Sequence, residues 1–414
     1  MFEPIGGHVP PQLADPNRKY LGAVMANRDD ASEPKTAVMK DEELACFCRK
    51  KKNDFFPESS IVKRCTRKRQ RKCLPQEMFL EILLRLPAQV VHNVMKHVCR
   101  EWNLMISAKD FIQHHLQNST RGIIIQEVFP ACRRDVIYVE MRRGCLEICK
   151  FDYGFEFLLW TSCNGLVVAR DLRDSHIYYV TNPLTKWRTV LPPNSRKMGN
   201  YSGFGLAFVE ASMKYKVVYA RGNERHCKPT QMAVLTIGVD KVWRHIDIGH
   251  SSLAIRRTLP LVTGGYVHWM GETFVLTLNV ESETIRWFPL PPFPKRSRKF
   301  LPMGCNLSFL HKTNEFMMEV WEMNPETGEW TMILRLDLEP LRYHFKDLCG
   351  NYAKVVPFGW LAIREVLVFS TGYPQTNCVA YNVKTREIQS FELGTTFKSY
   401  LVIPHVSSLV CLEG

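Results

Sequence analysis

The sequence predicts a multidomain chain: a disordered basic tail (residues 1–72), a small α-helical module (73–118) and an all-β propeller of about six blades (119–414). Three observations predict this division. Residues 1–72 show no sustained helical or strand periodicity. Apolar residues recur at helical spacing between Leu74 and Leu116. After Arg121 the chain consists of short apolar runs bounded by Gly, Pro, Asn or Asp, and one hairpin pattern returns several times.

The composition is that of an ordinary soluble protein. The chain has 414 residues, 45% of them hydrophobic, which is enough for a sizeable core. It contains no run of 18 uninterrupted apolar residues, and its start has neither the basic nor the apolar segment of a secretory signal. We therefore expect the nucleus, the cytoplasm or both as its location, and no membrane partner.

The 14 cysteines are irregularly spaced and include no Cys-x-x-Cys pair. The closest pairs are Cys46 with Cys48 and Cys145 with Cys149. This spacing fits neither a disulfide framework nor the usual zinc ligands, so we expect reduced thiols, no metal and no cofactor.

The formal charge of +14 is concentrated in the tail. Residues 49–72 hold eleven basic residues against two acidic ones. Two basic clusters separated by a spacer have the layout of a bipartite nuclear import signal; its residues are Lys51, Lys52, Lys63, Arg64, Arg67, Lys68 and Arg69. A merely solvated tail is the alternative, and nucleic-acid binding is not expected.

The stretch LPQEMFLEILLRLP, residues 74–87, begins the helical module. Its apolar residues from Met78 to Leu86 form one broad helical face, and Pro87 ends the segment. Val91, Val94, Met95, Val98 and Trp102 have the spacing of a second amphipathic helix. Ser107 and Asp110 resemble a capping box before a third short helix.

Three helices in about 45 residues make too small a core for an independent domain. An apolar face that is left over after such a module closes marks an interaction site. We therefore expect it to meet a partner. The alternative is that this face packs on the β-domain of the same chain.

Five hairpin units follow the pattern strand, polar turn, Trp or Ile, strand. They span residues 181–193, 236–248, 279–292, 323–336 and 381–393. Their anchor residues are Trp187, Trp243, Trp287, Trp330 and Ile388, which recur at the period of a four-stranded propeller blade. A weaker unit from Val136 to Phe151 lacks the Trp. We expect the anchors to pack between blades; a pair of β-sandwiches is the alternative fold.

The first Leu-Pro segment, the VCREW sequence at 98–102 and the HHL sequence at 114–116 together resemble the F-box. This helical module docks onto a Skp1-type adaptor protein, and through it onto a cullin, in Skp1-cullin-F-box (SCF) ubiquitin ligases. The resemblance implies the following adaptor-binding residues: Leu74, Pro75, Met78, Ile82, Leu83, Leu86, Pro87, Val91, Val98 and Trp102.

Downstream, SCNGLVV, YVTNPLTKWRTVLPP, VHWM and YNVKT look like the kelch-like, F-box-associated propeller region of plant F-box proteins. The two resemblances imply a non-catalytic subunit that recruits an unknown client protein for ubiquitination. Three rival roles are alternatives to this one. They are a propeller scaffold or nuclear interaction protein outside ubiquitin transfer, a propeller enzyme, which would need convergent acidic residues, and nucleic-acid binding through residues 49–72, which is the least expected and would depend steeply on salt.

The sequence has no recognisable catalytic motif: G-x-x-x-x-G-K-[ST], G-x-S-x-G and H-E-x-x-H are all missing. His268, which alternates along a strand, is expected to be a packed or surface histidine. Glu281 and Glu283 are expected in a solvated hairpin turn. Cys99 is expected on a helix of the module, as a packed thiol rather than a nucleophile.

Two loops, residues 191–197 and 289–299, end in basic residues. Because both follow a repeat Trp, we expect them on the same propeller face, where they could hold an acidic or phosphorylated client segment. The candidate residues are Arg196, Lys197, Lys295, Arg296, Arg298 and Lys299. The alternative is ordinary solvated loop charge.

Overall fold

The structure, a computed structural model, describes residues 76–129, 135–152, 156–174, 176–193, 202–222, 229–248, 259–294, 298–314, 316–339, 355–370, 375–395 and 399–412. The chain divides into two units, Met1–Cys65 and Thr66–Gly414, and all the described residues belong to the second. The predictions for the tail therefore lie outside the described residues.

Five short elements make up the helical module. They are α2 (Gln76–Arg85), α3 (Ala88–Asn93), the 3₁₀ turn η2 (Met95–His97), α4 (Arg100–Ile106) and α5 (Lys109–Asn118). Helix α2 ends before Pro87, as predicted, and α5 is the expected third helix.

The predicted second helix is wrong. The chain from Val91 to Trp102 runs through α3, η2 and α4, and Cys99 between the last two is fully extended (φ −157°, ψ 169°). Cys99 therefore precedes a helix instead of lying on one. Four valines between 90 and 98 favour such a break, because β-branched side chains crowd a helix. The break lets both Val91 and Trp102 point inward, at 0% and 4% exposure.

The predicted capping box is also wrong. The residue before α5 is Ala108, which makes no side-chain cap, and Ser107 ends α4 instead. The Ser107 hydroxyl bonds to the side chain of Asn103, 3.2 Å away.

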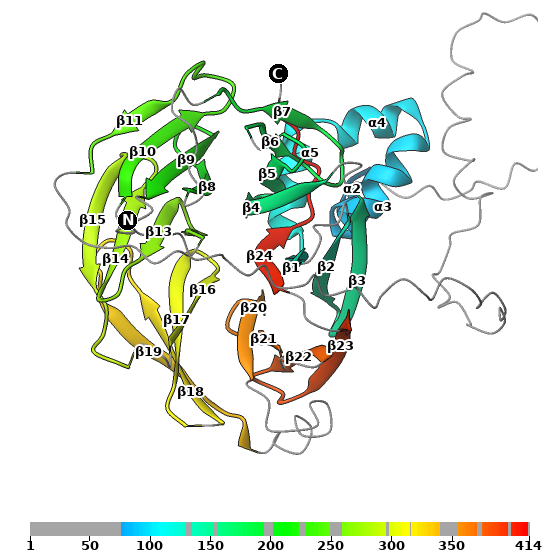
Figure 1. Ribbon diagram of the computed structural model, residues 1–414. Coiled ribbons are helices and arrows are strands. Elements are labelled where there is room, and N and C mark those ends of the chain that lie inside the picture. Colours follow the sequence, from blue (N-terminus) through cyan, green and yellow to red (C-terminus); the bar gives the residue numbers. More distant parts are fainter. Residues whose placement is uncertain are drawn as a thin grey trace, which may run out of the picture. The chain divides into compact units, whose positions relative to one another are not determined.

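Six antiparallel four-stranded sheets follow, and they form the blades of a propeller (Figure 1). Blade 1 consists of β24 (Ser399–Val406), β1 (Arg121–Phe129), β2 (Asp135–Arg142) and β3 (Cys145–Asp152). Blade 2 consists of β4 (Phe157–Cys163), β5 (Leu166–Asp171), β6 (Tyr178–Thr181) and β7 (Arg188–Val190). Blade 3 consists of β8 (Ser202–Val209), β9 (Lys214–Gly222), β10 (Pro229–Thr236) and β11 (Arg244–Ile246).

The other three blades have the same strand order. Blade 4 consists of β12 (Leu261–Thr263), β13 (Tyr266–Met270), β14 (Phe274–Asn279) and β15 (Thr284–Pro289). Blade 5 consists of β16 (Arg298–Met303), β17 (Asn306–Lys312), β18 (Met317–Met323) and β19 (Trp330–Asp337). Blade 6 consists of β20 (Val356–Ala362), β21 (Val366–Ser370), β22 (Gln375–Asn382) and β23 (Ile388–Thr395). The prediction of six blades is confirmed, and the sandwich alternative is excluded.

The ring closes in blade 1, where the last strand of the chain pairs with the first. β24 runs antiparallel to β1, with Arg121 opposite Val406 and Ile124 opposite Ile403. Each predicted hairpin unit is the third and fourth strand of a blade, and the weaker unit around Val136–Phe151 is the β2–β3 hairpin. The closure joins the start of the propeller, next to the helical module, to its end.

The propeller core lies between blades. Six clusters of buried apolar residues occupy the six interfaces between neighbouring blades. Middle strands such as β14 and β21 are buried along most of their length, because a blade covers each of their two faces. This is why their sequences read as continuous apolar runs rather than as alternating ones.

The anchor residues do pack between blades. Trp243 and Trp330 donate from Nε1 to the backbone carbonyls of Pro192, just after β7, and Pro289, the last residue of β15. Both carbonyls belong to the preceding blade. Trp287 packs on the cluster between blades 3 and 4. Trp187 differs, because it joins the cluster between blade 2 and the following blade.

Asparagine explains the turns of the repeated units. In blades 2, 4, 5 and 6 the Oδ1 of Asn182, Asn279, Asn324 or Asn382 accepts two backbone N–H groups from the following turn. The residue four positions later takes a positive φ in each case. An Asn side chain that mimics a turn in this way is favoured at such positions.

Candidate functional site

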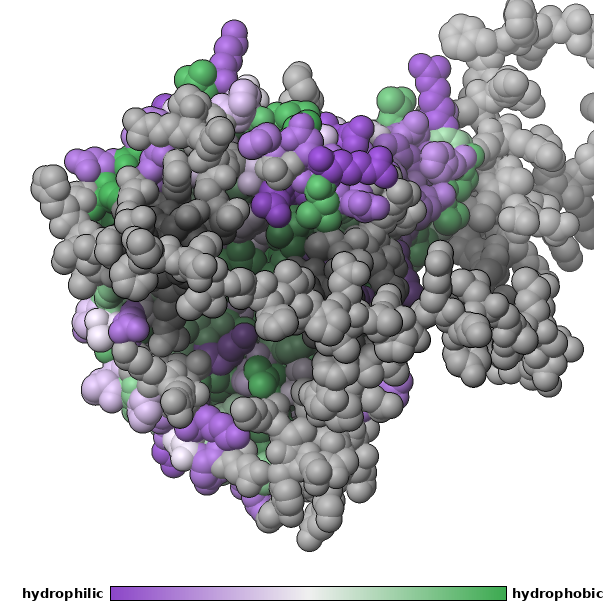
Figure 2. Space-filling view, in the orientation of Figure 1, coloured by the Kyte–Doolittle hydropathy of each residue, from purple (hydrophilic) through white to green (hydrophobic). Residues whose placement is uncertain are grey.

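The helical module carries apolar side chains that the described chain leaves uncovered. Met78 and Ile82 of α2 are 54% and 44% exposed, Val94 before η2 is 51% exposed, and Leu104 of α4 is 65% exposed. Hydrophilic and hydrophobic side chains lie side by side at the upper right of Figure 2. We call these four residues the uncovered face of the module.

The residues predicted to bind an adaptor fall into four groups. Met78 and Ile82 belong to the uncovered face, whereas Leu86, Pro87 and Val98 are half-buried. Leu74 and Pro75 lie outside the described residues. The other three, Leu83, Val91 and Trp102, are buried in the module, at 1%, 0% and 4% exposure.

These three buried residues shape the module from within. Trp102 lies against Phe79 of α2, with 4.2 Å between the ring centroids. Such side chains cannot contact a second protein while the module keeps this fold. Their spacing in the sequence could not separate a core position from a surface one, because both carry apolar residues.

Helix α5 covers a different side of the module. Its Ile112 and Leu116 pack against the apolar cluster between blades 2 and 3, which also contains Val410 near the carboxyl terminus. The alternative that the helices pack on their own β-domain is thus true of α5 and not of the uncovered face. A second contact joins Gln89 of α3 to Cys149 of β3, with Nε2 3.2 Å from Sγ.

His115 holds two parts of the module together. The side chain is 1% exposed, and its Nε2 lies 2.9 Å from the backbone carbonyl of Leu86. This contact requires a proton on Nε2, since a carbonyl only accepts. Ser119 Oγ lies 3.2 Å from the other ring nitrogen. Burial lowers the pKa of His115, and the Leu86 carbonyl opposes that shift.

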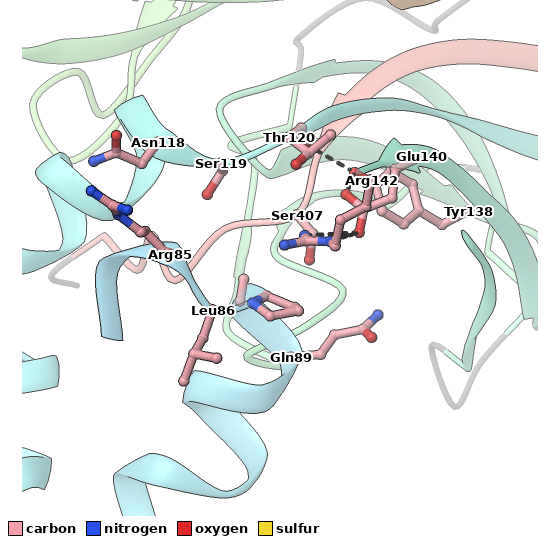
Figure 3. Close-up of a pocket in the computed structure, with 12 residues that line it drawn as sticks. Arg85, Leu86, Gln89, Asn118, Ser119, Thr120, Tyr138, Glu140, Arg142 and Ser407 are labelled. Atoms are coloured by element: carbon pink, nitrogen blue, oxygen red, sulfur yellow. Dashed lines mark hydrogen bonds and ion pairs between the residues drawn. The ribbon is translucent and has the colours of Figure 1, made fainter. Parts of the chain in front are cut away.

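A small polar pocket lies where the module meets blade 1 (Figure 3). Leu86, between α2 and α3, and Gln89 of α3 line it from the module, and Glu140 and Arg142 line it from β2. The Arg142 guanidinium pairs with the buried Glu140 carboxylate at 3.0 Å.

Tyr138, on the same strand, also lines this pocket, and it donates to Glu140 at 3.2 Å. Burial and the Glu140 charge raise the pKa of Tyr138 well above its usual value. Ser407 lies between the two sets of side chains in this view. The bonded side chains of the pocket wall, Tyr138, Glu140 and Arg142, all belong to β2, and residues of the module line another part of the pocket.

The client-binding candidates are only partly described. Arg196, Lys197, Lys295 and Arg296 lie outside the described residues, and so does the side chain of Arg298. Arg298 and Lys299 belong to β16, so they lie on a strand rather than in the predicted loop. Lys299 is exposed. The loop at 191–197 follows β7, and the loop at 289–299 follows β15. Each of these strands ends at the opposite end of its blade from the turn that precedes it, β6–β7 or β14–β15.

His268 and Glu283 have structural partners. His268 is fully buried between the hydroxyls of Thr263 and Thr277, at 2.8 and 3.0 Å, and burial lowers its pKa to about 3. Glu283 lies in the predicted turn, but it is bonded to Lys216 and Arg244 of the preceding blade.

Within the described ranges, no three His, Cys, Asp or Glu side chains are grouped as metal ligands would be. The helices among these residues are also too short or too polar to cross a lipid bilayer.

Sequence reasoning missed Val94 and Leu104 as parts of the uncovered face. Leu104 had a readable signal, because it stands two positions after Trp102 and therefore on the other side of a helix. It also missed Asn182, whose Nδ2 donates to the carbonyls of Ser408 and Val410 at 2.9 and 2.8 Å. The sequence gives no signal for that contact, which joins residues more than 220 positions apart.

Comparisons with known proteins agree with this architecture. Residues 147–408 match the F-box associated beta propeller domain. An F-box protein of Arabidopsis thaliana is 24% identical over 294 residues, covering 65% of this chain and 80% of the relative. A second F-box protein of that plant is 21% identical over 402 residues, covering 85% of this chain and 88% of the relative.

An F-box/kelch-repeat protein of the same plant is 23% identical over 320 residues, covering 64% of this chain and 72% of the relative. Among solved structures, TolB from Acinetobacter baumannii aligns with a TM-score of 0.42 and 10% identity over 75% of this chain and 73% of its own. The family match covers more than half of the chain, and it contains blades 2 to 6 together with β24 and most of β3 of blade 1. The chain therefore belongs to the family of proteins with an F-box associated beta propeller domain.

Proposed function

We propose that this chain is the client-recruiting subunit of an SCF ubiquitin ligase. The helical module would bind a Skp1-type adaptor and through it a cullin, while the propeller would hold the client. The observation that carries the proposal is the uncovered face, Met78, Ile82, Val94 and Leu104, on a module whose other side is packed against the propeller.

The exposure of apolar side chains on the module is the physical basis of this proposal. Exposed apolar patches on soluble proteins mark interaction sites, and an amphipathic helix commonly supplies the anchors. A standard interface buries about 800 Å² on each partner. Relatives of this chain are named F-box proteins, and this supports a Skp1-type adaptor as the partner.

The mechanism in this role is positional. The chain would contribute no reacting group, and would raise the effective concentration of a client lysine near the ubiquitin carrier. Lys299 and the basic residues of the two loops stay candidates for holding an acidic or phosphorylated client segment. The two basic clusters between Lys51 and Arg69 stay candidates for nuclear import.

The test is direct binding of the full chain to a purified Skp1-family protein. The Met78→Glu/Ile82→Glu double variant should bind roughly thirtyfold more weakly or worse, because losing a central anchor costs about 2 kcal/mol or more. Met213 and Met332 are exposed to a similar extent on the propeller, at 55% and 43%. The matched control Met213→Glu/Met332→Glu should bind like the wild type.

Two outcomes would contradict the proposal. The folded wild-type chain could fail to bind any Skp1-family protein, which would favour a propeller scaffold outside ubiquitin transfer. The double variant and its control could instead bind equally well, which would place the contact away from the uncovered face.

A further inference from the structure

The carboxyl-terminal segment, Ser407–Leu412, follows the last propeller strand and is buried for most of its length. Ser408, Leu409 and Val410 are 1%, 4% and 8% exposed. A segment beyond the last strand needs no such burial to close the ring, because β24 already pairs with β1 up to Val406. The burial of this segment therefore needs an explanation other than ring closure.

The segment is bonded to both tight turns of blade 2. Its Ser408 hydroxyl donates to the carbonyl of Asn164 at 2.7 Å, in the turn between β4 and β5. Asn182, in the turn between β6 and β7, donates from one amide nitrogen to the carbonyls of Ser408 and Val410. Asn182 thereby supplies a donor to two backbone carbonyls of this largely buried segment, and buried carbonyls need such donors.

Asn182 also keeps the ordinary turn role of its equivalents. Its Oδ1 accepts the N–H groups of Leu184 and Thr185, as Asn324 does for Glu326 and Thr327 in blade 5. Asn182 therefore uses both ends of its side chain, one for the turn and one for the carboxyl-terminal segment. Blade 2 thus has a turn built to hold a segment as well as to reverse the chain.

The same place receives the helical module. Ile112 and Leu116 of α5 and Leu412 pack on the apolar cluster that includes Val410. In Figure 1 the red end of the chain passes beside α5 and the blade formed by β4 to β7, in agreement with the shared cluster. Ser407 lines the polar pocket between the module and β2.

We propose that the carboxyl-terminal segment, held by Asn182, is the positioning element that fixes the helical module on the propeller. This inference rests on the proposed function for its purpose: an adaptor held by α2 and α4 and a client held by the propeller would keep a constant separation. Asn182 touches neither partner in this account, and acts through Ser408 and Val410.

The test uses hydrogen exchange of the full chain, with three variants. Asn182→Ala loses the turn bonds and the bonds to the segment, whereas Asn324→Ala loses only the equivalent turn bonds in blade 5. Val410→Asp places a charge in the apolar cluster and leaves the turn intact. We expect α5 amides to exchange about tenfold faster in Asn182→Ala and Val410→Asp, and at the wild-type rate in Asn324→Ala.

Equal α5 exchange in Asn182→Ala, Asn324→Ala and the wild type would overturn the inference. Adaptor binding is measured on the same variants and should change less than twofold, since the uncovered face is elsewhere on the module. Small-angle scattering of the adaptor complex should show a broader distance distribution for Asn182→Ala and Val410→Asp, and the wild-type distribution for Asn324→Ala. If the wild type binds no Skp1-family protein, the proposed function fails, and the exchange result still decides whether the segment holds the module.

Discussion

The two sides of the helical module differ in what covers them. On one side, Ile112 and Leu116 of α5 pack against the propeller, and bonded side chains line the junction. On the other side, Met78 and Leu104 stand more than half exposed. Burying apolar surface is the main favourable contribution to folding. In the proposed function, a partner would cover the apolar side chains that the described chain leaves exposed.

The largest expected loss of stability comes from substitutions in the buried core of the module, between its covered and uncovered sides. Trp102→Ala should destabilise the module by about 3–5 kcal/mol, because the buried indole leaves a cavity. Leu104→Ala, two residues later and 65% exposed, should change stability by less than about 0.5 kcal/mol. Denaturant unfolding, with hydrogen exchange to localise the loss, measures both. A similar cost for the two variants would mean that the module has no such division.

Acidic pH should lower the stability of the propeller through β24, the strand that leads to the covered side of the module. His405 of β24 is 5% exposed, and burial lowers its pKa to about 3. Burial also lowers the pKa of the fully buried His268, in blade 4, to about 3. The unfolded chain binds a proton near pH 6.5 that the folded chain does not accept. Stability is therefore fully present above pH 6.5 and falls as the pH decreases toward 3.

The expected loss is about 1.4 kcal/mol per pH unit for each histidine, or about 2 kcal/mol each at pH 5. Unfolding of the wild type and of His405→Gln at pH 7 and pH 5 measures it. The variant should lose less stability between these two values. Identical pH dependence in the two proteins would show that His405 is not responsible.

Two glycines test how closely the carboxyl-terminal segment packs on blade 2, on the covered side. A Cβ on Gly165 would come within 1.9 Å of the Ser408 hydroxyl, whereas a Cβ on Gly144 would meet nothing within 4 Å. Both have positive φ, +86° and +80°, so both carry the same backbone penalty of about 1 kcal/mol. Gly165→Ala should cost about 1–3 kcal/mol more and speed exchange in α5. Thermal unfolding of both variants gives the difference, which should vanish if Ser408 can move aside freely.

The smallest expected effect on stability belongs to the uncovered face. Leu104→Glu should leave the free energy of unfolding within about 0.5 kcal/mol of the wild type, yet weaken binding to a Skp1-type adaptor. Calorimetric titration beside Val242→Glu, at a propeller turn residue that is 70% exposed, gives the comparison. Undiminished binding by Leu104→Glu would remove α4 from the proposed interface.

Much of the fold was readable in the sequence because propeller blades repeat. In blades 2, 4, 5 and 6 an Asn that builds the turn, such as Asn324, precedes an anchor residue such as Trp330. Position in the repeat therefore predicted position in the blade. Ring closure was not readable, because the pairing of β24 with β1 joins the two ends of the propeller sequence.

The candidate site was only half readable. Helical spacing predicted the apolar face of α2 but could not tell the buried Leu83 from the exposed Ile82, which are neighbours on one helix. That distinction depends on where α5 and α4 pack. The break of the second helix at Cys99 likewise follows from burying Val91 and Trp102 together, a tertiary demand that overrides local periodicity.

The measurement that tests the central claim most directly is a hydrogen-exchange footprint of the full chain, free and bound to a Skp1-family protein. Adaptor binding to the uncovered face predicts slower exchange in α2 and α4, with α5 and the propeller strands unchanged. Protection of the propeller strands instead of α2 and α4, or no protection of the module at all, would contradict the account.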